Sequence, residues 1–145
     1  MMKVRRFKLS DLNQILQIEA YAFPKTSYTS QIFLHYHHAF PDTFLVIEED
    51  KLLGYIIFTP DGHIISLAVD PAHRRKGIGT KLMNACGSQF KISRFWVEVR
   101  ESNIGAHRFY EKLGFQFKSK ICLYYGTEDA YVLEKKIYGA EPVSF

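Results

Sequence analysis

The chain has 145 residues, of which 47% are hydrophobic and 23% are charged, a balance typical of a single globular domain. This composition excludes a collagen, a disordered tail and a disulfide-rich secreted module. Nineteen Lys and Arg residues against fifteen Asp and Glu residues give a formal net charge of +4. An excess of this size suits an anionic ligand as well as a nucleic acid, and does not choose between them.

The sequence indicates a cytoplasmic protein without a membrane segment. No apolar run approaches the roughly 18–20 residues that cross a bilayer. The basic start Met1-Met2-Lys3-Val4-Arg5-Arg6 is not followed by the uninterrupted apolar stretch of an export signal. Cys86 and Cys122 have no metal-like spacing, so we expect two free thiols in a reducing compartment.

Hydrophobic spacing predicts the element order β-α-α-β-β-β-α-β-α-β-β. Strands are predicted over residues 3–9, 44–47, 53–58, 63–69, 95–99, 115–124 and 130–135, and helices after a cap at 10–11 and over 29–39, 78–90 and 103–113. An antiparallel start followed by helix crossovers indicates an α/β protein with a mixed sheet and helices on its faces. We expect one domain over residues 1–137 and a mobile tail over residues 138–145.

The segment between the predicted strand 63–69 and the next helix is basic and rich in glycine. It reads Asp70-Pro71-Ala72-His73-Arg74-Arg75-Lys76-Gly77-Ile78-Gly79-Thr80. Main-chain N–H groups at a helix N-terminus have no internal partner, and glycines let an anion approach them closely. A Walker loop is absent, and Leu82 occupies the third glycine position of a dinucleotide fingerprint. What remains is a pyrophosphate loop of the form Arg-x-x-Gly-x-Gly, a solvated basic turn, a nucleic-acid patch or ordinary helix-start glycines.

Four blocks in this order carry a family resemblance. They are Leu67–Thr80, Val97–Asn103, Phe109–Phe115 and the pattern Tyr124-Tyr125 followed by Glu128-Asp129-Ala130. Together they resemble the GNAT acetyltransferase superfamily, and within it the ribosomal-protein N-terminal alanine and archaeal N-terminal acetyltransferases. The resemblance spans about residues 3 to 137. It implies the GNAT fold, a mixed and mostly antiparallel central sheet of about seven strands flanked by about four helices.

The resemblance implies acetyl-CoA as cosubstrate and assigns residues to it. Main-chain groups of Leu67 to Val69 would pair with the pantetheine arm like an added strand, and amides from Arg75 to Thr80 would hold the pyrophosphate. Asn103 matches a residue that contacts the pantetheine region, and it also suits a plain helix N-cap. The residues expected to bind acetyl-CoA are Leu67, Ala68, Val69, Arg74, Arg75, Lys76, Gly77, Ile78, Gly79, Thr80 and Asn103.

The same resemblance implies Glu98 as the general base and Tyr110 as the general acid. An α-amino group has a pKa of about 7.7–8.0 and is partly neutral at pH 7, whereas a lysine amine near 10.4 is almost fully charged. A carboxylate acting through water therefore suffices for an N-terminal amine. From the residues alone, Glu98 also reads as a surface glutamate paired with Arg100, and Tyr110 as a buried packing residue.

The acceptor substrate is expected between two groups of aromatic residues. Tyr124 and Tyr125 would lie at the end of a strand and hydrogen-bond the first residues of the substrate. Phe23 and Pro24 would form the facing wall. A tyrosine pair in a strand is also compatible with plain core packing.

The leading hypothesis is therefore an acetyl-CoA-dependent N-acetyltransferase that acts on the N-terminal amine of a protein or peptide by direct transfer. A lysine side chain or a small amine is the alternative acceptor. A non-catalytic acyl-CoA sensor, or a nucleic-acid binder using residues 73–76, is the alternative from another class. We expect neither a nucleic acid nor a membrane as partner. We also expect no metal, because His35 and His38 share a helix face without further ligands.

Overall fold

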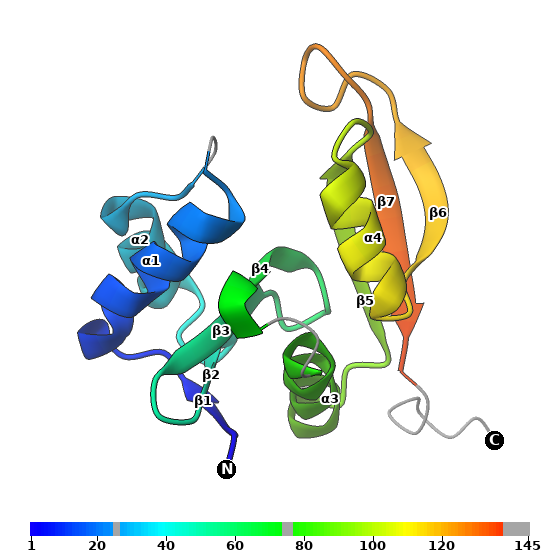
Figure 1. The fold of residues 1–145 in the computed structure, drawn as a ribbon. Coiled ribbons are helices and arrows are strands. Elements are labelled where there is room, and N and C mark those ends of the chain that lie inside the picture. The colour runs from blue at the N-terminus through cyan, green and yellow to red at the C-terminus, as the bar shows by residue number, and fades with distance from the viewer. Residues whose placement is uncertain (25–26, 74–76, 138–145) are drawn as a thin grey trace, which may run out of the picture.

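The computed structural model describes residues 1–24, 27–73 and 77–137, so the expected mobile tail lies outside the described residues. In this part of the chain the helices are α1 (Leu12–Ala22), α2 (Ser30–Ala39), α3 (Ile78–Phe90) and α4 (Ile104–Lys112). The strands are β1 (Lys3–Arg6), β2 (Phe44–Glu48), β3 (Leu52–Phe58), β4 (Ile64–Val69), β5 (Arg94–Arg100), β6 (Gln116–Ile121) and β7 (Ala130–Lys136) (Figure 1). None of the described helices is long and apolar enough to span a membrane.

The strands form two antiparallel sheets, with the orders β1-β2-β3-β4 and β5-β7-β6. The two sheets meet at one parallel bridge between His63 and Trp96, where the Trp96 N–H donates to the Gly62 carbonyl at 3.1 Å. Beyond this bridge β4 and β5 diverge (Figure 1). The predicted fold class is confirmed, and the expected central sheet is divided by this divergence.

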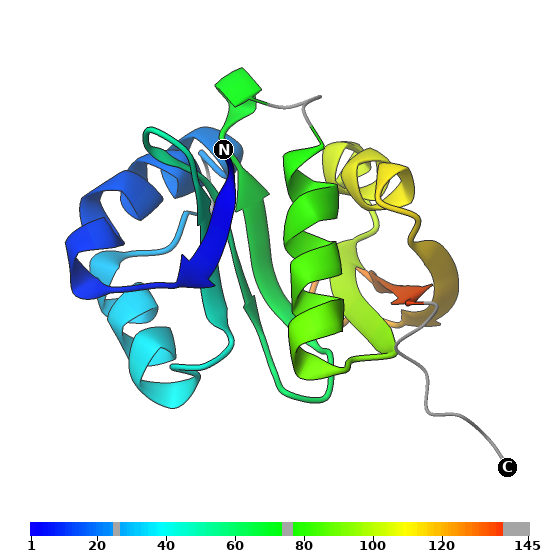
Figure 2. The same cartoon turned by 90° about the horizontal axis from the view of Figure 1, so that it is seen from below.

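Helices cover both faces of the four-stranded sheet. Figure 2 shows α1 and α2 on one face and α3 on the other. Ile15 and Phe33 belong to the cluster under α1 and α2, while Leu82 and Cys86 belong to the cluster under α3. Every residue of β3 is buried because both of its faces are covered.

The structure corrects two predicted boundaries. The first strand ends at Arg6, and Leu9–Asp11 forms a 3₁₀ turn before α1. The Asp11 side chain does not cap α1, because it accepts hydrogen bonds from Arg5 Nη1 at 2.8 Å and from the Lys8 N–H at 2.9 Å. The strand predicted to reach residue 124 ends at Ile121, where the chain turns and Leu123 adopts a left-handed φ of 49°.

Candidate functional site

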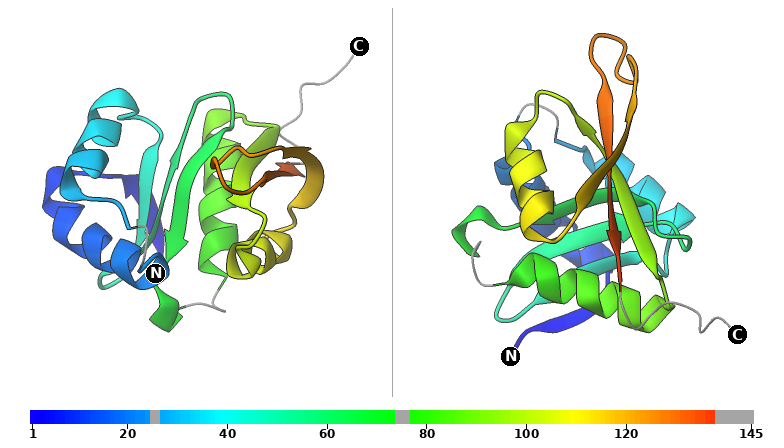
Figure 3. Two further views of the ribbon diagram at one scale, coloured as in Figure 1. Left: turned by 90° about the horizontal axis from the view of Figure 1, so that it is seen from above. Right: turned by 90° about the vertical axis from the view of Figure 1, so that its right-hand side faces the viewer.

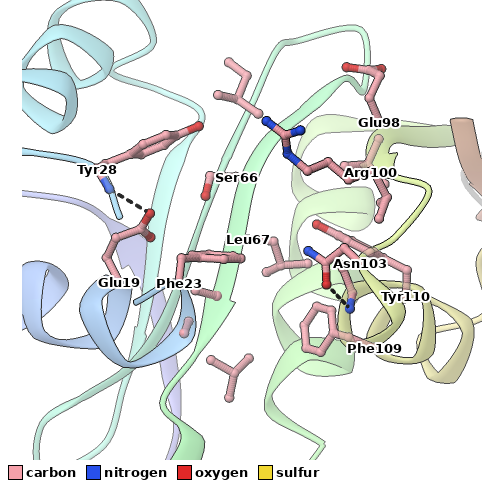
Figure 4. A pocket seen from close by; sticks show the side chains of 18 of the residues that line it. Glu19, Phe23, Tyr28, Ser66, Leu67, Glu98, Arg100, Asn103, Phe109 and Tyr110 are labelled. Carbon is pink, nitrogen blue, oxygen red and sulfur yellow. Dashed lines mark hydrogen bonds between the residues drawn. The ribbon is translucent and has the colours of Figure 1, made fainter. Parts of the chain in front are cut away.

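A cavity of about 690 Å³ lies between the diverging strands β4 and β5. One wall comes from the end of α1 and the loop that follows it, and the other comes from β5 and α4 (Figure 4). β4 runs between these walls. Because the two sheets separate here, the cavity has both polar and apolar lining from elements far apart in sequence.

Leu67, Ala68 and Val69, the predicted pantetheine-binding residues, all line this cavity. They belong to β4, which pairs with β3 along one edge. On the other edge, the only pairing recorded among residues 1–24, 27–73 and 77–137 is the bridge at His63, which precedes β4. Unpaired main-chain groups at a strand edge can pair with an extended ligand. The geometry therefore provides the free edge that an added strand requires.

The first turn of α3 lies beside one end of the cavity. A Cβ added to Gly79 would approach Leu113 Cδ2 at 3.1 Å and the ring of Phe109, which lines the cavity, at 3.7 Å. The absence of a side chain at Gly79 therefore serves the packing of α3 on α4. Gly77 has a φ of 69° at the N-cap, and this left-handed conformation favours glycine.

The remaining residues of the predicted pyrophosphate loop divide into three groups. Ile78 is buried in the core, while Thr80 is exposed in the first turn of α3. Arg74, Arg75 and Lys76 lie outside the described residues.

Glu98 lies on β5 and lines the cavity. Alternation along the strand places Val97 and Val99 in the core and leaves Glu98 on the opposite face, 16% exposed. One carboxylate oxygen, Oε1, lies 2.7 Å from His63 Nε2, and the His63 ring stacks on Trp96. The alternative that Glu98 pairs with Arg100 is wrong, because Arg100 pairs with Glu128.

His63 is a contact residue that sequence reasoning missed. It lies 35 residues from Glu98 in sequence, just before β4. The bridge between the two sheets brings it next to β5. No local motif marks such a pairing, so the sequence carried no signal for it beyond the residue type.

Tyr110 extends from α4 with 7% of its surface exposed, and it lines the cavity. Figure 4 shows its hydroxyl directed toward the opening between the two walls. Burial raises the pKa of this hydroxyl well above its usual value of 10, and the nearby Tyr28, Tyr125 and Glu98 raise it further. The hydroxyl is therefore neutral, and a hydrogen-bond donor, throughout the ordinary pH range. Its ring also packs edge-on against Phe115, so the packing interpretation holds as well.

Asn103 is the N-cap of α4, as expected, and it also lies at the cavity. Its side-chain oxygen accepts a hydrogen bond from the Ala106 N–H at 3.0 Å and thereby caps α4. The same residue lines the cavity.

The structure brings only part of the expected acceptor wall to the cavity. Phe23 and Tyr125 line it, whereas Pro24 and Tyr124, although described, do not. Tyr124 is half exposed, and both tyrosines lie in the turn between β6 and β7 rather than at a strand end. Figure 3 shows this turn at the tip of a hairpin that extends past the rest of the sheet.

Arg100 and Glu128 hold the β6–β7 turn against β5. The Arg100 guanidinium lies 4.0 Å from the centre of the Tyr125 ring, and its Nη1 donates to Glu128 Oε1 at 3.1 Å. The other Glu128 oxygen accepts from the Ser102 N–H at 3.2 Å. These hydrogen bonds lower the pKa of Glu128 below its usual value. Glu128, the first residue of the Glu128-Asp129 pattern, thus fixes the loop that carries Tyr125.

A second carboxylate, Glu19 of α1, lines the opposite wall and was also missed from the sequence. It is 1% exposed and accepts hydrogen bonds from the Tyr28 N–H at 3.1 Å and from the Tyr55 hydroxyl. Burial raises the pKa of Glu19, while these two hydrogen bonds oppose the rise. Its position four residues after Ile15, on the buried face of α1, was the signal that could have found it.

Within residues 1–24, 27–73 and 77–137, no group of three His, Cys, Asp or Glu side chains lies close enough to hold a metal ion. The expected absence of a metal stays a prediction.

Comparison with known proteins agrees with the family resemblance of the sequence. The profile of the acetyltransferase (GNAT) family matches residues 9–115. An uncharacterized N-acetyltransferase of Methanocaldococcus jannaschii is 37% identical over 93% of this chain and 92% of its own. An N-alpha-acetyltransferase of Sulfurisphaera tokodaii is 32% identical over 90% of each chain. The crystal structure of Ard1 from Thermoplasma volcanium superposes with a TM-score of 0.78 and 28% identity, covering 94% of this chain and 97% of that one.

Proposed function

This chain belongs to the GNAT acetyltransferase family, and we propose that it transfers an acetyl group from acetyl-CoA to the N-terminal α-amine of a protein or peptide. The observation that carries the proposal is the cavity between β4 and β5. It combines a free strand edge, a carboxylate and a neutral phenol, and the N-terminus of α3 lies beside one end of it. The similarity to a protein named N-alpha-acetyltransferase supports the choice of acceptor.

The free edge of β4 and the first turn of α3 suit two parts of acetyl-CoA, the pantetheine arm and the pyrophosphate. Main-chain groups of Leu67 to Val69 would pair with the pantetheine arm, and one of their amides would polarise the thioester carbonyl. The unpaired N–H groups at the start of α3 would hold the pyrophosphate. Asn103, already at the cavity wall, would contact the pantetheine region. Acetyl-CoA itself supplies the acetyl thioester.

Glu98 would remove the proton that the amine loses. The amine nitrogen forms a bond to the carbonyl carbon as the carbon–sulfur bond breaks, and the excess proton passes to Glu98 directly or through water. His63 Nε2 holds one oxygen of this carboxylate and thereby orients it. Since an α-amine has a pKa of about 7.7–8.0, a moderately basic carboxylate is sufficient.

Tyr110 would stabilise the departing sulfur. The neutral hydroxyl donates a hydrogen bond to the sulfur as it leaves and passes it a proton, and the proton that Glu98 took from the amine returns to the Tyr110 oxygen through water, so that both groups end in their starting states. The raised pKa of Tyr110 ensures that this donor is present at the pH of the reaction.

The acceptor peptide would approach from the side of Phe23, Tyr28 and Tyr125, which line the cavity. This arrangement supports a flexible chain end as acceptor, because its first residues can extend between the aromatic side chains of the two walls.

Two peptides of the same length, which differ in sequence only at one lysine position, test the choice of acceptor. The first has a free N-terminus and no lysine, and the second has a blocked N-terminus and one lysine. We expect acetylation of the first peptide only. Mass spectrometry of the peptide and the release of free thiol both measure it. Acetylation of the blocked peptide at a comparable rate would instead assign the lysine side chain as acceptor.

A further inference from the structure

Three elements of the acceptor side meet at the buried carboxylate of Glu19, and a fourth is joined to them through Tyr55. Glu19 belongs to α1, its Oε1 accepts from the main-chain N–H of Tyr28 in the loop before α2, and its Oε2 accepts from the hydroxyl of Tyr55 on β3. The Tyr55 hydroxyl also lies 2.8 Å from Ser66 Oγ on β4. Figure 4 shows Glu19 and its bond to Tyr28 on the wall that faces Tyr110 across the cavity.

A carboxylate buried to this degree destabilises a fold unless hydrogen bonds compensate for the lost hydration. An apolar residue would serve the core of α1 equally well, since its neighbours Ile15 and Ile18 are apolar. The carboxylate of Glu19 is therefore explained by the groups that it holds in place, and not by the packing of the core. One of them fixes the main chain of Tyr28, whose ring lines the cavity and packs edge-on against Phe33 at 5.6 Å.

We propose that Glu19 is a positioning residue for the acceptor: its carboxylate anchors the loop between α1 and α2, through the Tyr28 amide, and so sets the wall against which the acceptor peptide binds. The inference rests on the proposed function. Glu19 is not the base itself, because it is 1% exposed and both of its oxygens are engaged.

The variants Glu19→Leu and Glu19→Gln separate anchoring from charge. Leucine accepts no hydrogen bond, so the Tyr28 amide loses its partner. The KM for the acceptor peptide should then rise about tenfold, the equivalent of this one lost hydrogen bond. Glutamine keeps an oxygen for the Tyr28 amide, so its peptide KM should stay within about twofold of wild type. The KM for acetyl-CoA should change less than about twofold in both variants.

Asp11→Asn is the matched control. Asp11 is also a buried acid beside α1, 3% exposed, but it binds Arg5 and the Lys8 N–H and does not line the cavity. We expect this variant to be less stable than wild type with an unchanged peptide KM, which shows that lost stability alone does not move the readout. If Glu19→Leu does not fold, Tyr55→Phe replaces it, and its peptide KM should rise about threefold because the carboxylate loses one of its two anchors.

Hydrogen exchange at the Tyr28 amide gives a readout that does not depend on activity. The amide should be protected in wild type and in Glu19→Gln, and exposed in Glu19→Leu. An unchanged peptide KM in Glu19→Leu, or a Glu19→Gln variant as impaired as Glu19→Leu, overturns the inference. If wild type acetylates no peptide amine, the proposed function fails, while the exchange data still decide whether Glu19 anchors the loop.

Discussion

Glu98 has one oxygen held and one oxygen available. Oε1 contacts His63 Nε2, while Oε2 has no hydrogen bond to any residue in the described part of the chain. A general base needs a fixed orientation and an acceptor site that faces the substrate. The His63 contact provides the first condition, and the position of Glu98 at the cavity provides the second.

Glu98→Gln should lower kcat by about 10²–10⁴-fold, the usual contribution of a positioned base. The affinity for coenzyme A, measured by calorimetry, should stay unchanged because the substitution preserves shape and removes only basicity. Glu101→Gln, an exposed glutamate three residues further on that does not line the cavity, is the control and should keep wild-type activity. A Glu98→Gln enzyme with full kcat would remove Glu98 from the mechanism.

Tyr110 predicts the shape of the pH profile. A group that acts in its protonated form loses activity only as the pH rises through its pKa, and here burial raises that pKa above 10. The wild-type kcat should therefore not fall between pH 8 and pH 10. Tyr110→Phe should lower kcat at every pH in this range without creating a new inflection. An alkaline decline in wild type that Tyr110→Phe abolishes would contradict this assignment.

At this scale, the sequence identified cavity residues that occur in a local motif, and missed contacts that cross the fold. Glu98 and Tyr110 stand in recognisable blocks, and both line the cavity. His63 and Glu19 act through the sheet bridge and through the packing of α1 on β3, and no spacing along the chain encodes those contacts.

At the scale of the elements, the N-cap residue Asn103 determines where α4 begins. The Asn103 side chain satisfies the Ala106 N–H, one of the amides that a helix start leaves unpaired. Asn103 also lines the cavity, so one side chain caps the helix and lies where we propose that acetyl-CoA binds.

A pair of N-cap substitutions separates these two roles. Thr29 caps α2 by accepting from the Ile32 N–H, but it does not line the cavity. Thr29→Ala and Asn103→Ala should each lower the free energy of unfolding by about 1 kcal/mol, the usual contribution of a cap. Only Asn103→Ala should also weaken coenzyme A binding, by about two- to tenfold. Equal coenzyme A affinity in both variants would leave Asn103 as a cap alone.

The helices and strands were largely predictable because their hydrophobic periods are regular. Helix α3 has the predicted range 78–90, and its apolar residues Leu82 and Cys86 are buried. Errors arose where side chains compete with the pattern, as at Asp11, which binds Arg5 instead of capping α1. The strand predicted over residues 115–124 was too long because Tyr124 is a β-favouring aromatic residue. Glu128 and Asp129 instead accept hydrogen bonds from the Ser102 and Leu123 N–H groups and hold this segment as a turn.

For the molecule as a whole, the free energy of unfolding should fall at low pH as paired carboxylates such as Asp11 become protonated. Burial opposes its ionisation, but hydrogen bonds from Arg5 and the Lys8 N–H hold its pKa below the usual 3.8. A lowered folded pKa contributes stability that is present above pH 3.8 and lost as the pH falls through the folded value. Asp11→Asn should therefore cost about 1.5–3 kcal/mol at pH 7. In urea titrations, the difference from wild type should shrink below pH 3.8, and a constant difference across that range would contradict the pairing.

The division of the sheet could not be read from the sequence, because β4 and β5 are each ordinary strands. Their divergence beyond the bridge of His63 and Trp96 depends on how the two sheets pack against α3 and α4. This divergence creates both the cavity and the free edge of β4, and so the whole proposed site depends on it.

Hydrogen exchange with and without coenzyme A tests this dependence most directly. We expect coenzyme A to slow exchange at the amides of Leu67–Val69 that do not bond to β3 by more than about tenfold, while the amides of β6 are unaffected. Calorimetric binding of coenzyme A without added protection at Leu67–Val69, or no binding by the folded protein, would contradict the proposal that the free edge of β4 receives the cosubstrate.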